Sequence, residues 1–180
     1  MPRPPENFAT ERLVARLPRM DDATTIFGAY ASDPAVTRYL AWRNYSELEP
    51  LRDFLRGVIH TWENGAPGHY AWLLCLRGTD VPIGSIGVGF DLHGAVAGYV
   101  LEQAHWGQSL MAEALRYLTA WTLAQPPLHR VWAYCDAENR ASARVMEKAG
   151  WVREGLLRRW HVCPTIGPEP RDCLIYAKVR

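Results

Sequence analysis

The sequence lacks any apolar run that approaches the roughly 20 residues needed to cross a bilayer. Its opening stretch, Met1–Pro5, reads Met-Pro-Arg-Pro-Pro and has no apolar centre of the kind found in a signal peptide. A membrane span and a secretory leader are therefore both unsupported. We expect a cytoplasmic protein with no membrane partner.

Cysteine is sparse and does not occur in pairs. The four cysteines are scattered, with no Cys-x-x-Cys motif to suggest zinc or redox chemistry. The six histidines also show no pair at metal-ligand spacing. We predict reduced thiols in the core or at the surface, and no metal site. The residues concerned are Cys75, Cys135, Cys163 and Cys173, with His60, His69, His93, His105, His129 and His161.

An excess of charge is also missing. Twenty basic and nineteen acidic residues give a net charge of +1, which provides no global field to attract nucleic acid. There is no linker, internal repeat or low-complexity tract. With 180 residues, 48% of them apolar, and eight tryptophans, the chain can bury a sizeable core. We expect one domain over residues 1–180, monomeric or homodimeric, without direct nucleic-acid binding.

Two common catalytic fingerprints are absent. The stretch Gly84–Gly89 resembles a dinucleotide-binding motif, but it lies within an expected strand rather than opening a helix. Ser85 in this stretch is not part of a Gly-x-Ser-x-Gly nucleophile elbow. The sequence therefore predicts neither a Rossmann dehydrogenase nor a serine hydrolase.

The most informative stretch runs from Ala97 to Met111, where an apolar strand leads into a long helix. Val96–Leu101 is nearly all apolar, as expected for a strand covered on both faces. The helix is predicted to run from Ser109 to Gln125, with Glu113 and Arg116 facing water and Gly107 allowing close approach near its first turn. Unpaired N–H groups and the helix dipole favour an anion at this turn. The alternative is an ordinary β-α connection.

The rest of the chain predicts a mixed sheet flanked by helices. We expect residues 1–10 to be loose, and helical segments capped by Asp21 or Asp22, by Asp33 and by Ser46. A shorter helix ends at Gly150. This order gives an α/β or α+β fold with about seven strands. The expected strands are residues 12–17, 69–76, 83–90, 96–101, 128–135, 151–160 and 172–179.

One expected strand has a side made only of small residues. In residues 83–90, Ser85, Gly87 and Gly89 alternate with larger apolar residues. Small residues on one face of a strand allow another group to come close to the backbone. We therefore expect some other part of the protein or a ligand to pack on this side.

Several ordered partial motifs, spread over nearly the whole chain, resemble the GNAT superfamily of acetyl-CoA-dependent N-acetyltransferases. Within it, the chain is similar to the ribosomal-protein N-terminal acetyltransferases, the RimJ/RimL-like branch. The resemblance implies the GNAT fold, a mixed sheet that is splayed at the acetyl-CoA site. The segments that carry it are Thr10–Leu17, Ile83–Ile86, Gly98–Glu102, Trp106–Gln108, Glu113–Leu115, Glu138–Ser142, Glu147–Trp151 and Arg171–Tyr176.

The resemblance also implies where acetyl-CoA binds. The end of the strand near Leu101 offers backbone groups to the pantetheine arm, amides of the following loop and helix hold the pyrophosphate, and Asn139 orients the pantetheine. Ser109 departs from the family pattern, which usually has glycine there, and its Cβ could crowd the phosphates. The cofactor-binding residues predicted in this way are Val100, Leu101, Gln108, Ser109, Leu110, Met111 and Asn139.

Two residues are the predicted catalytic groups. Glu102 ends the strand beside the expected thioester and is the first choice for deprotonating an amine, with Asp136 as a weaker second choice. Ser142 matches the family position that provides a hydroxyl near the departing sulfur, and its alternative role is a helix cap. Asn139 can both cap the helix and orient the pantetheine. Val145 and Met146 occupy the region where many relatives carry a catalytic tyrosine.

Two further groups of residues have open roles. The basic residues Arg153, Arg158 and Arg159 can contact the adenosine 3′-phosphate or an acidic acceptor, or can form a solvated strand face. The aromatic residues around the second and third helices are core residues or the wall of an acceptor groove. The latter are Tyr39, Trp42, Tyr45 and Trp62.

The predicted reaction is transfer of an acetyl group from acetyl-CoA to a primary amine by direct attack in a ternary complex, without a metal. We favour a protein or peptide α-amine, whose deprotonation at pH 7 costs roughly 1 kcal/mol, against 4 to 5 for lysine. Glu47, Glu49 and Asp53 are interleaved with arginines, which disfavours polyamines. The alternatives are a small-molecule amine, another acyl-CoA such as succinyl-CoA, or a catalytically silent acyl-CoA-binding module.

Overall fold

A computed structural model describes residues 2–65, 68–92 and 94–180; Met1, Ala66, Pro67 and His93 lie outside the described residues. Its eight strands form a single sheet in the order β1-β2-β3-β4-β5-β6-β8-β7. The strands are β1 (Phe8–Ala9), β2 (Leu13–Arg16), β3 (His69–Leu76), β4 (Pro82–Phe90), β5 (Gly94–Leu101), β6 (Arg130–Asp136), β7 (Val152–Val162) and β8 (Pro170–Val179). The helices are α1 (Asp22–Ile26), the π-helix η1 (Phe27–Ala31), α2 (Pro34–Thr37), α3 (Leu48–Asn64), the 3-10 helix η2 (Gln103–His105), α4 (Leu110–Ala124) and α5 (Arg140–Lys148).

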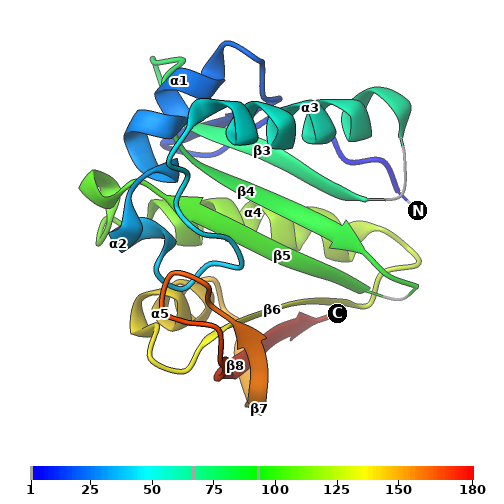
Figure 1. Ribbon diagram of the computed structural model, residues 1–180. Helices are drawn as coiled ribbons and strands as arrows, with labels where there is room; N and C mark the ends of the chain where they lie inside the picture. The colour runs from blue at the N-terminus through cyan, green and yellow to red at the C-terminus, as the bar shows by residue number, and fades with distance from the viewer. Residues whose placement is uncertain (1, 66–67, 93) are drawn as a thin grey trace.

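The sheet is mixed because one of its pairings is parallel. Strands β5 and β6 run parallel, and all other neighbouring strands are antiparallel. The β5–β6 ladder ends at the pair Val96–Trp132, after which the two strands separate towards α5 (Figure 1). The fold class and the splayed sheet expected from the sequence are therefore confirmed.

The eighth strand, β1, corrects the expectation that residues 1–10 are loose. Phe8 and Ala9 pair with Ala15 and Val14 of β2. The Phe8 ring stacks on Tyr117 of α4, with ring centroids 4.2 Å apart, so that burial of this ring fixes the segment. The sequence offered only one large apolar residue here, which is too short a pattern to indicate a strand.

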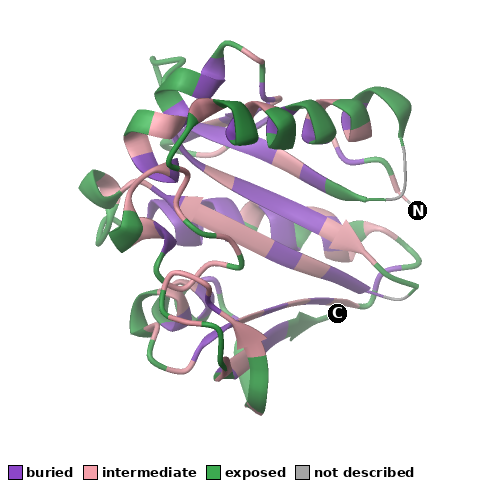
Figure 2. Ribbon diagram, viewed as in Figure 1, coloured by how far each residue is buried: buried purple, intermediate pink, exposed green. Residues whose placement is uncertain are grey.

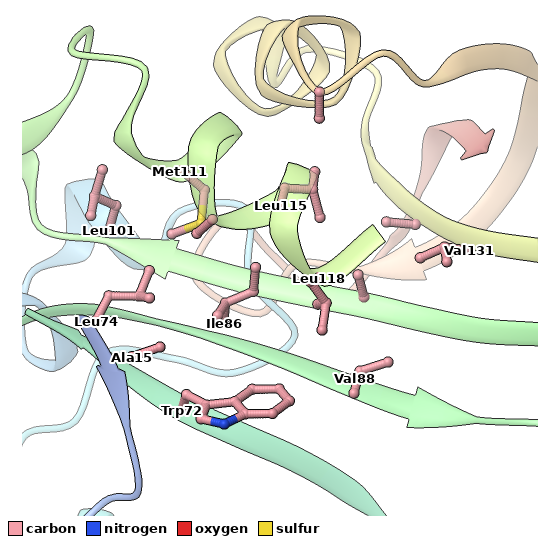
Figure 3. Packing of buried hydrophobic residues seen from close by; sticks show 14 of the residues in the cluster. Ala15, Trp72, Leu74, Ile86, Val88, Leu101, Met111, Leu115, Leu118 and Val131 are labelled. Atoms are coloured by element: carbon pink, nitrogen blue, oxygen red, sulfur yellow. The ribbon is translucent and has the colours of Figure 1, made fainter. Parts of the chain in front are cut away.

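Helices cover both faces of the sheet. Helices α1 to α3 lie on one face and α4 lies on the other (Figure 1). Met111, Leu115 and Leu118 of α4 pack against Ile86 and Val88 of β4 in the main core (Figure 3). Buried positions follow the strands beneath the helices, and exposed positions follow the outer side of α3 (Figure 2). No helix within the described ranges is long and apolar enough to span a membrane.

Strand β5 is fully covered on one face and only partly covered on the other, where Val100 packs against buried residues of α1, η1 and α3, so the expectation of two covered faces holds only in part. Ala95, Ala97 and Leu101 are buried in the core on the α4 side. Val96 and Val100, which point to the other face, are only half-buried. This second face lines a cleft, so the apolar run marked a binding surface as well as a core strand.

The helix ends agree with the expected caps in part. The Asp33 carboxylate accepts from the Ala35 N–H, and the Asn139 amide oxygen accepts from the Ser142 N–H. Helix α3 begins after Glu47, so the expectation of a Ser46 cap was wrong by one residue. At α1 the Asp21 side chain makes no capping bond. The expected Gly150 end of α5 is confirmed by its φ of 83°.

Glu113 corrects a further expectation, because it does not face water. Its carboxylate accepts from the Arg12 backbone N–H at 2.9 Å and from Arg12 Nε at 2.8 Å. Burial opposes ionisation of Glu113, but hydrogen bonds from Thr10 and Arg12 outweigh it and hold the pKa below its usual value. This ion pair ties the chain before β2 to the first turns of α4. Arg116 is exposed, as expected.

Candidate active site

A cleft of about 1460 Å³ crosses the place where β5 and β6 separate. Its floor is the open face of β3, β4 and β5, and its walls come from the segment 34–45, α3, the start of α4, β6 and α5. The cleft therefore joins the predicted anion site to the predicted acceptor side. Six of the seven predicted cofactor-binding residues line it, namely Val100, Leu101, Ser109, Leu110, Met111 and Asn139, together with Ser142.

The glycines of β4 provide a seat for an imidazole ring on the cleft floor. A Cβ at Gly87 would lie 2.5 Å from His69 Nε2, and a Cβ at Gly89 would lie 3.1 Å from His69 Nδ1. A Cβ at Gly98 of β5 would lie 3.9 Å from the same Nε2. The ring thus lies across three glycines, which confirms that another group packs on the small side of this strand.

The turn before α4 adopts left-handed backbone conformations. Gly107 has a φ of 77° and Ser109 a φ of 61°. Nothing lies within 4 Å of a Cβ placed on Gly107, so its conformation and not close packing requires glycine there. Ser109 occupies the conformation that a glycine adopts freely, which gives a physical reason for the glycine usual at this position.

Two basic side chains of α5 complement the start of α4. The Lys148 ammonium donates to Ser109 Oγ at 2.8 Å, and both Arg144 and Lys148 line the cleft. Because the first amides of α4 lack intrahelical partners and carry the positive end of the dipole, this end of the cleft favours an anion. Gln108 does not line the cleft; its backbone carbonyl accepts from Arg12 and its side chain donates to Ala104.

Trp106 closes the turn between β5 and α4. Its Nε1 donates to the Leu101 carbonyl at 2.7 Å, while its ring lines the cleft and stays 44% exposed. The bond fixes the path of the chain as it leaves the sheet. Trp106 therefore holds the turn in place and also forms part of the cleft wall.

A pair of hydroxyl groups lies at the splay. Tyr99 Oη and Ser142 Oγ are 2.8 Å apart, and the phenol is also 3.2 Å from the Ser142 carbonyl. Burial raises the pKa of Tyr99, so the phenol stays protonated. Asn139 is the helix cap, which leaves the Ser142 hydroxyl in the cleft wall rather than at the cap. The expected capping role of Asn139 is confirmed, and the alternative capping role of Ser142 was wrong.

Glu102 and Asp136, the two carboxylates predicted as possible catalytic bases, are not among the residues that line the cleft. Glu102 does not line the cleft; its Oε2 lies 3.5 Å from His105 Nε2, and His105 does line it. The catalytic role of Glu102 stays a prediction. Asp136 is buried and accepts from Arg171, and these bonds outweigh burial to hold its pKa below the usual value. Asp136 thus holds β8 to β6 through an ion pair.

The structure distinguishes the two groups of residues whose roles the sequence left open, the aromatic residues and the arginines, by whether they line the cleft. Tyr39, Trp42 and Tyr45 are half-buried and line the cleft. Trp62 is 3% exposed and belongs to the core, with its Nε1 donating to the Ala71 carbonyl. Three of the four aromatic residues thus form a wall. The arginines of β7 are exposed and outside the cleft lining, as a solvated strand face would be; they are Arg153, Arg158 and Arg159.

The cleft wall carries positive but no negative side chains. Arg38, Arg144 and Lys148 line it, and no aspartate or glutamate does so among the described residues. The described part of this wall therefore offers no carboxylate to pair with a cationic ligand. Within residues 2–65, 68–92 and 94–180 no group of histidine, cysteine, aspartate or glutamate side chains could hold a metal ion.

The family model described as the acetyltransferase (GNAT) domain matches residues 12–152. The chain belongs to the GNAT acetyltransferase family. It is 28% identical to the "uncharacterized N-acetyltransferase p20" of Bacillus licheniformis, over 85% of this chain and 86% of that protein. The crystal structure of a GNAT-family acetyltransferase from Bacillus anthracis superposes with a TM-score of 0.82 and 27% identity, covering 96% and 98% of the two chains.

A more distant structure has the same fold. RimL, a ribosomal L7/L12 alpha-N-protein acetyltransferase in complex with coenzyme A, superposes with a TM-score of 0.83 at 19% identity, covering 97% and 98% of the two chains. The match to the GNAT family model and to an N-acetyltransferase relative, and not this distant structure, identifies the protein as an acetyl-CoA-dependent acyltransferase. The cleft fits acetyl-CoA, because the α4 amides with Lys148 suit a pyrophosphate and the gap between β5 and β6 exposes strand backbone to a pantetheine arm.

Sequence reasoning missed four of these cleft residues. Arg144 and Lys148 are four residues apart on α5, so helical spacing would have placed both on one side. The role of Tyr99 depends on α5 meeting β5, and local sequence carries no signal for that contact. The small residues of β4 predicted that some group packs on this strand, but they did not identify that group as His69.

Proposed function

We propose that the chain acetylates the α-amine of a protein or peptide N-terminus, using acetyl-CoA in a ternary complex. The observation that carries this proposal is the cleft, which runs from the start of α4 past the Tyr99–Ser142 pair to an aromatic wall that has no carboxylate among the residues that the structure describes. A branch close to the ribosomal-protein acetyltransferases is supported by the fold shared with RimL. All eight strands share one sheet, which supports a single domain over residues 1–180.

The charge of the cleft supports an α-amine over a lysine or a polyamine. A polyamine brings several positive charges, and Arg38, Arg144 and Lys148 would repel them without a compensating carboxylate. An α-amine is mostly protonated at pH 7 but is far easier to neutralise than a lysine side chain, because its pKa is about 7.7 to 8.0 compared with about 10.4 for lysine. A peptide N-terminus also presents apolar atoms that Trp42 and Tyr45 can cover.

The Tyr99–Ser142 pair supports a way to protonate the leaving thiolate. Acetyl-CoA supplies an activated acyl group, and the amine displaces its sulfur as a thiolate. Either hydroxyl can be the donor in this pair, and in the arrangement in which the Tyr99 phenol donates to Ser142 Oγ the Ser142 proton is free to point towards the cleft. Ser142 then donates to the thiolate while Tyr99, with its raised pKa, stays protonated and holds the hydroxyl in place.

A second candidate is a small-molecule amine that carries a planar group. The Trp42 and Tyr45 rings lie 5.3 Å apart with a 32° angle between their planes, and the Arg38 guanidinium lies 5.4 Å from the Tyr39 ring centre. Such a wall can stack a flat ring, and Arg38 can meet an anionic group on it. Acetylation of this class would indicate a metabolic or detoxifying role.

The deciding experiment has two stages. Acetyl-CoA at a hundred times its Kd should raise the free energy of unfolding by about 2.7 kcal/mol, and an unmoved melting temperature would overturn the proposal. A thiol-release assay then compares peptides with free N-termini, N-blocked peptides carrying lysine, spermidine, free amino acids and aromatic amines. Preference for free N-termini supports the proposal, and preference for any other class refutes this acceptor.

The same assay separates the remaining alternatives. Succinyl-CoA turned over faster than acetyl-CoA would change the acyl donor, and binding of acetyl-CoA without thiol release from any acceptor would indicate a silent binding module. The cytoplasm is the proposed compartment. It is supported by the four unpaired cysteines, since disulfides are rare there.

A further inference from the structure

The His69 ring lies on the floor of the cleft, at a place where the strands beneath it carry glycines. It lies over Gly87, Gly89 and Gly98, where a Cβ on Gly87 would come within 2.5 Å of Nε2. These glycines belong to two neighbouring strands and are aligned by the register that pairs Gly87 with both Ala71 and Gly98. An alanine at residue 87 would displace the His69 ring, so the observed position of the imidazole requires glycine at residue 87.

The ring lies where the sheet opens. The β5–β6 ladder ends at Val96, and Gly98 is the next residue of β5 on the same face. His69 Nε2 is 3.9 Å from a Cβ placed on Gly98, so the nitrogen lies above the start of the gap. Ser142 and Tyr99 line the same cleft from the α5 side. An amine bound in the cleft can therefore reach His69 Nε2 at the start of the gap.

The other titratable groups of the cleft are less suited to accept a proton. Burial raises the pKa of the Cys135 thiol to about 11 and also raises that of Tyr99. His105 lies beside Glu102, and His161 Nδ1 is 3.3 Å from the Tyr134 hydroxyl. By contrast, neither ring nitrogen of His69 has a hydrogen-bond partner among the described residues. Both nitrogens are available to a ligand.

The ring is also in the right protonation state. The strands beneath it remove water from one ring face while the residue stays exposed on the cleft side, and this loss of hydration lowers its pKa. The residues directly under the ring, Gly87, Gly89 and Gly98, carry no charge. A neutral imidazole at pH 7 has one nitrogen able to accept a proton.

We propose that His69 is the catalytic base that takes the proton from the acceptor amine, an inference that rests on the proposed acetyltransferase function. The amine nitrogen forms a bond to the acetyl carbonyl carbon, and the carbon–sulfur bond breaks with its electron pair leaving on sulfur. One proton passes from the amine nitrogen to His69. Ser142 or solvent protonates the thiolate; where Ser142 does so, it regains a proton from solvent, and His69 returns its proton to solvent.

The test is His69→Gln in the full chain, with the best acceptor from the amine panel. A glutamine keeps the size and polarity of the side chain but is not basic. We expect kcat to fall about 100-fold with an unchanged KM for acetyl-CoA, and the rise of rate with pH that reports the imidazole to disappear. Added imidazole should partly restore the activity of His69→Ala, which a merely structural role would not permit. His60→Gln, on the exposed face of α3, is the matched control.

Three outcomes would overturn the proposal. His69→Gln with activity within threefold of the parent and an unchanged pH profile removes His69 from the chemistry. A loss confined to Glu102→Gln or His161→Gln assigns the base to that residue. A parent chain that binds acetyl-CoA but acetylates no amine overturns the proposed function together with the role of His69, whereas an active parent with an unaffected His69→Gln overturns only the latter.

Discussion

Ser109 holds a left-handed backbone conformation at the start of α4, with φ 61° and ψ 13°. Its side chain makes no capping bond to the helix and instead accepts from Lys148. We predict that Ser109→Gly increases the free energy of unfolding, because glycine adopts this conformation without the contact between Cβ and the following carbonyl.

The magnitude follows from three opposing contributions. A residue with a Cβ in this conformation costs about 1 to 2 kcal/mol, and glycine removes that cost. Glycine also makes the unfolded chain more flexible, which takes back about 0.4 to 1 kcal/mol. Loss of the Lys148–Ser109 contact, whose ammonium is exposed, costs less than about 0.5 kcal/mol. The net gain is about 0.5 kcal/mol, or about 1 to 2 °C in Tm.

The assay is urea denaturation and thermal melting of the parent, Ser109→Gly and Ser109→Ala. The alanine variant loses the hydroxyl but keeps the strained backbone, so it isolates the Lys148 contact. Glycine should exceed alanine by about 0.8 kcal/mol, the difference between the strain and the flexibility contributions. Acetyl-CoA Kd should stay within about threefold of the parent, because the backbone N–H at residue 109 is kept.

Two results would refute this reasoning. If Ser109→Gly is no more stable than Ser109→Ala, the conformation at residue 109 stores no strain. If Ser109→Gly weakens acetyl-CoA binding tenfold or more while Ser109→Ala does not, the glycine has disordered the turn. Equal weakening in both variants would show that the hydroxyl itself contacts the phosphates.

Three further predictions follow from the cleft and its supports. Lys148→Met should weaken acetyl-CoA binding about fivefold, less at high salt, while loss of the contact with Ser109 lowers the melting temperature of the free protein by less than about 2 °C; a salt-independent effect on binding would contradict a phosphate contact. Ser142→Ala should lower kcat about 10- to 100-fold with little change in acetyl-CoA Kd, and Tyr99→Phe should lower it less; a larger loss for Tyr99→Phe would make the phenol the donor. Asp136→Asn should cost about 2 kcal/mol at pH 7, because Arg171 loses its buried partner. Because the pKa of Asp136 is lowered in the folded protein, the carboxylate stabilises the fold above a pH of about 4, and this stabilisation is lost below it. The free energy of unfolding measured in urea should therefore fall less at acid pH for the variant than for the parent.

Local sequence patterns were enough to predict the order of the elements and the turn between β5 and α4. The long apolar spacing of α4 and the run of Val96–Leu101 are local patterns, and local periodicity is enough to predict a helix and a buried strand. The helix caps at Asp33 and Asn139 were also local, since a cap depends on a side chain and amides two or three residues away.

The tertiary structure alone decided which side chains share the cleft. Glu113 pairs with Arg12, 101 residues away, and Tyr99 meets Ser142, 43 residues away, so neither contact leaves a trace in local spacing. The small residues of β4 predicted that some group packs against this strand. That this group is His69 depends on the register of β3, which places His69 opposite Gly89. Strand pairing brings distant residues together by backbone hydrogen bonds, which every residue except proline can form. The chemistry of the cleft therefore depends on a register that no single stretch of the sequence specifies.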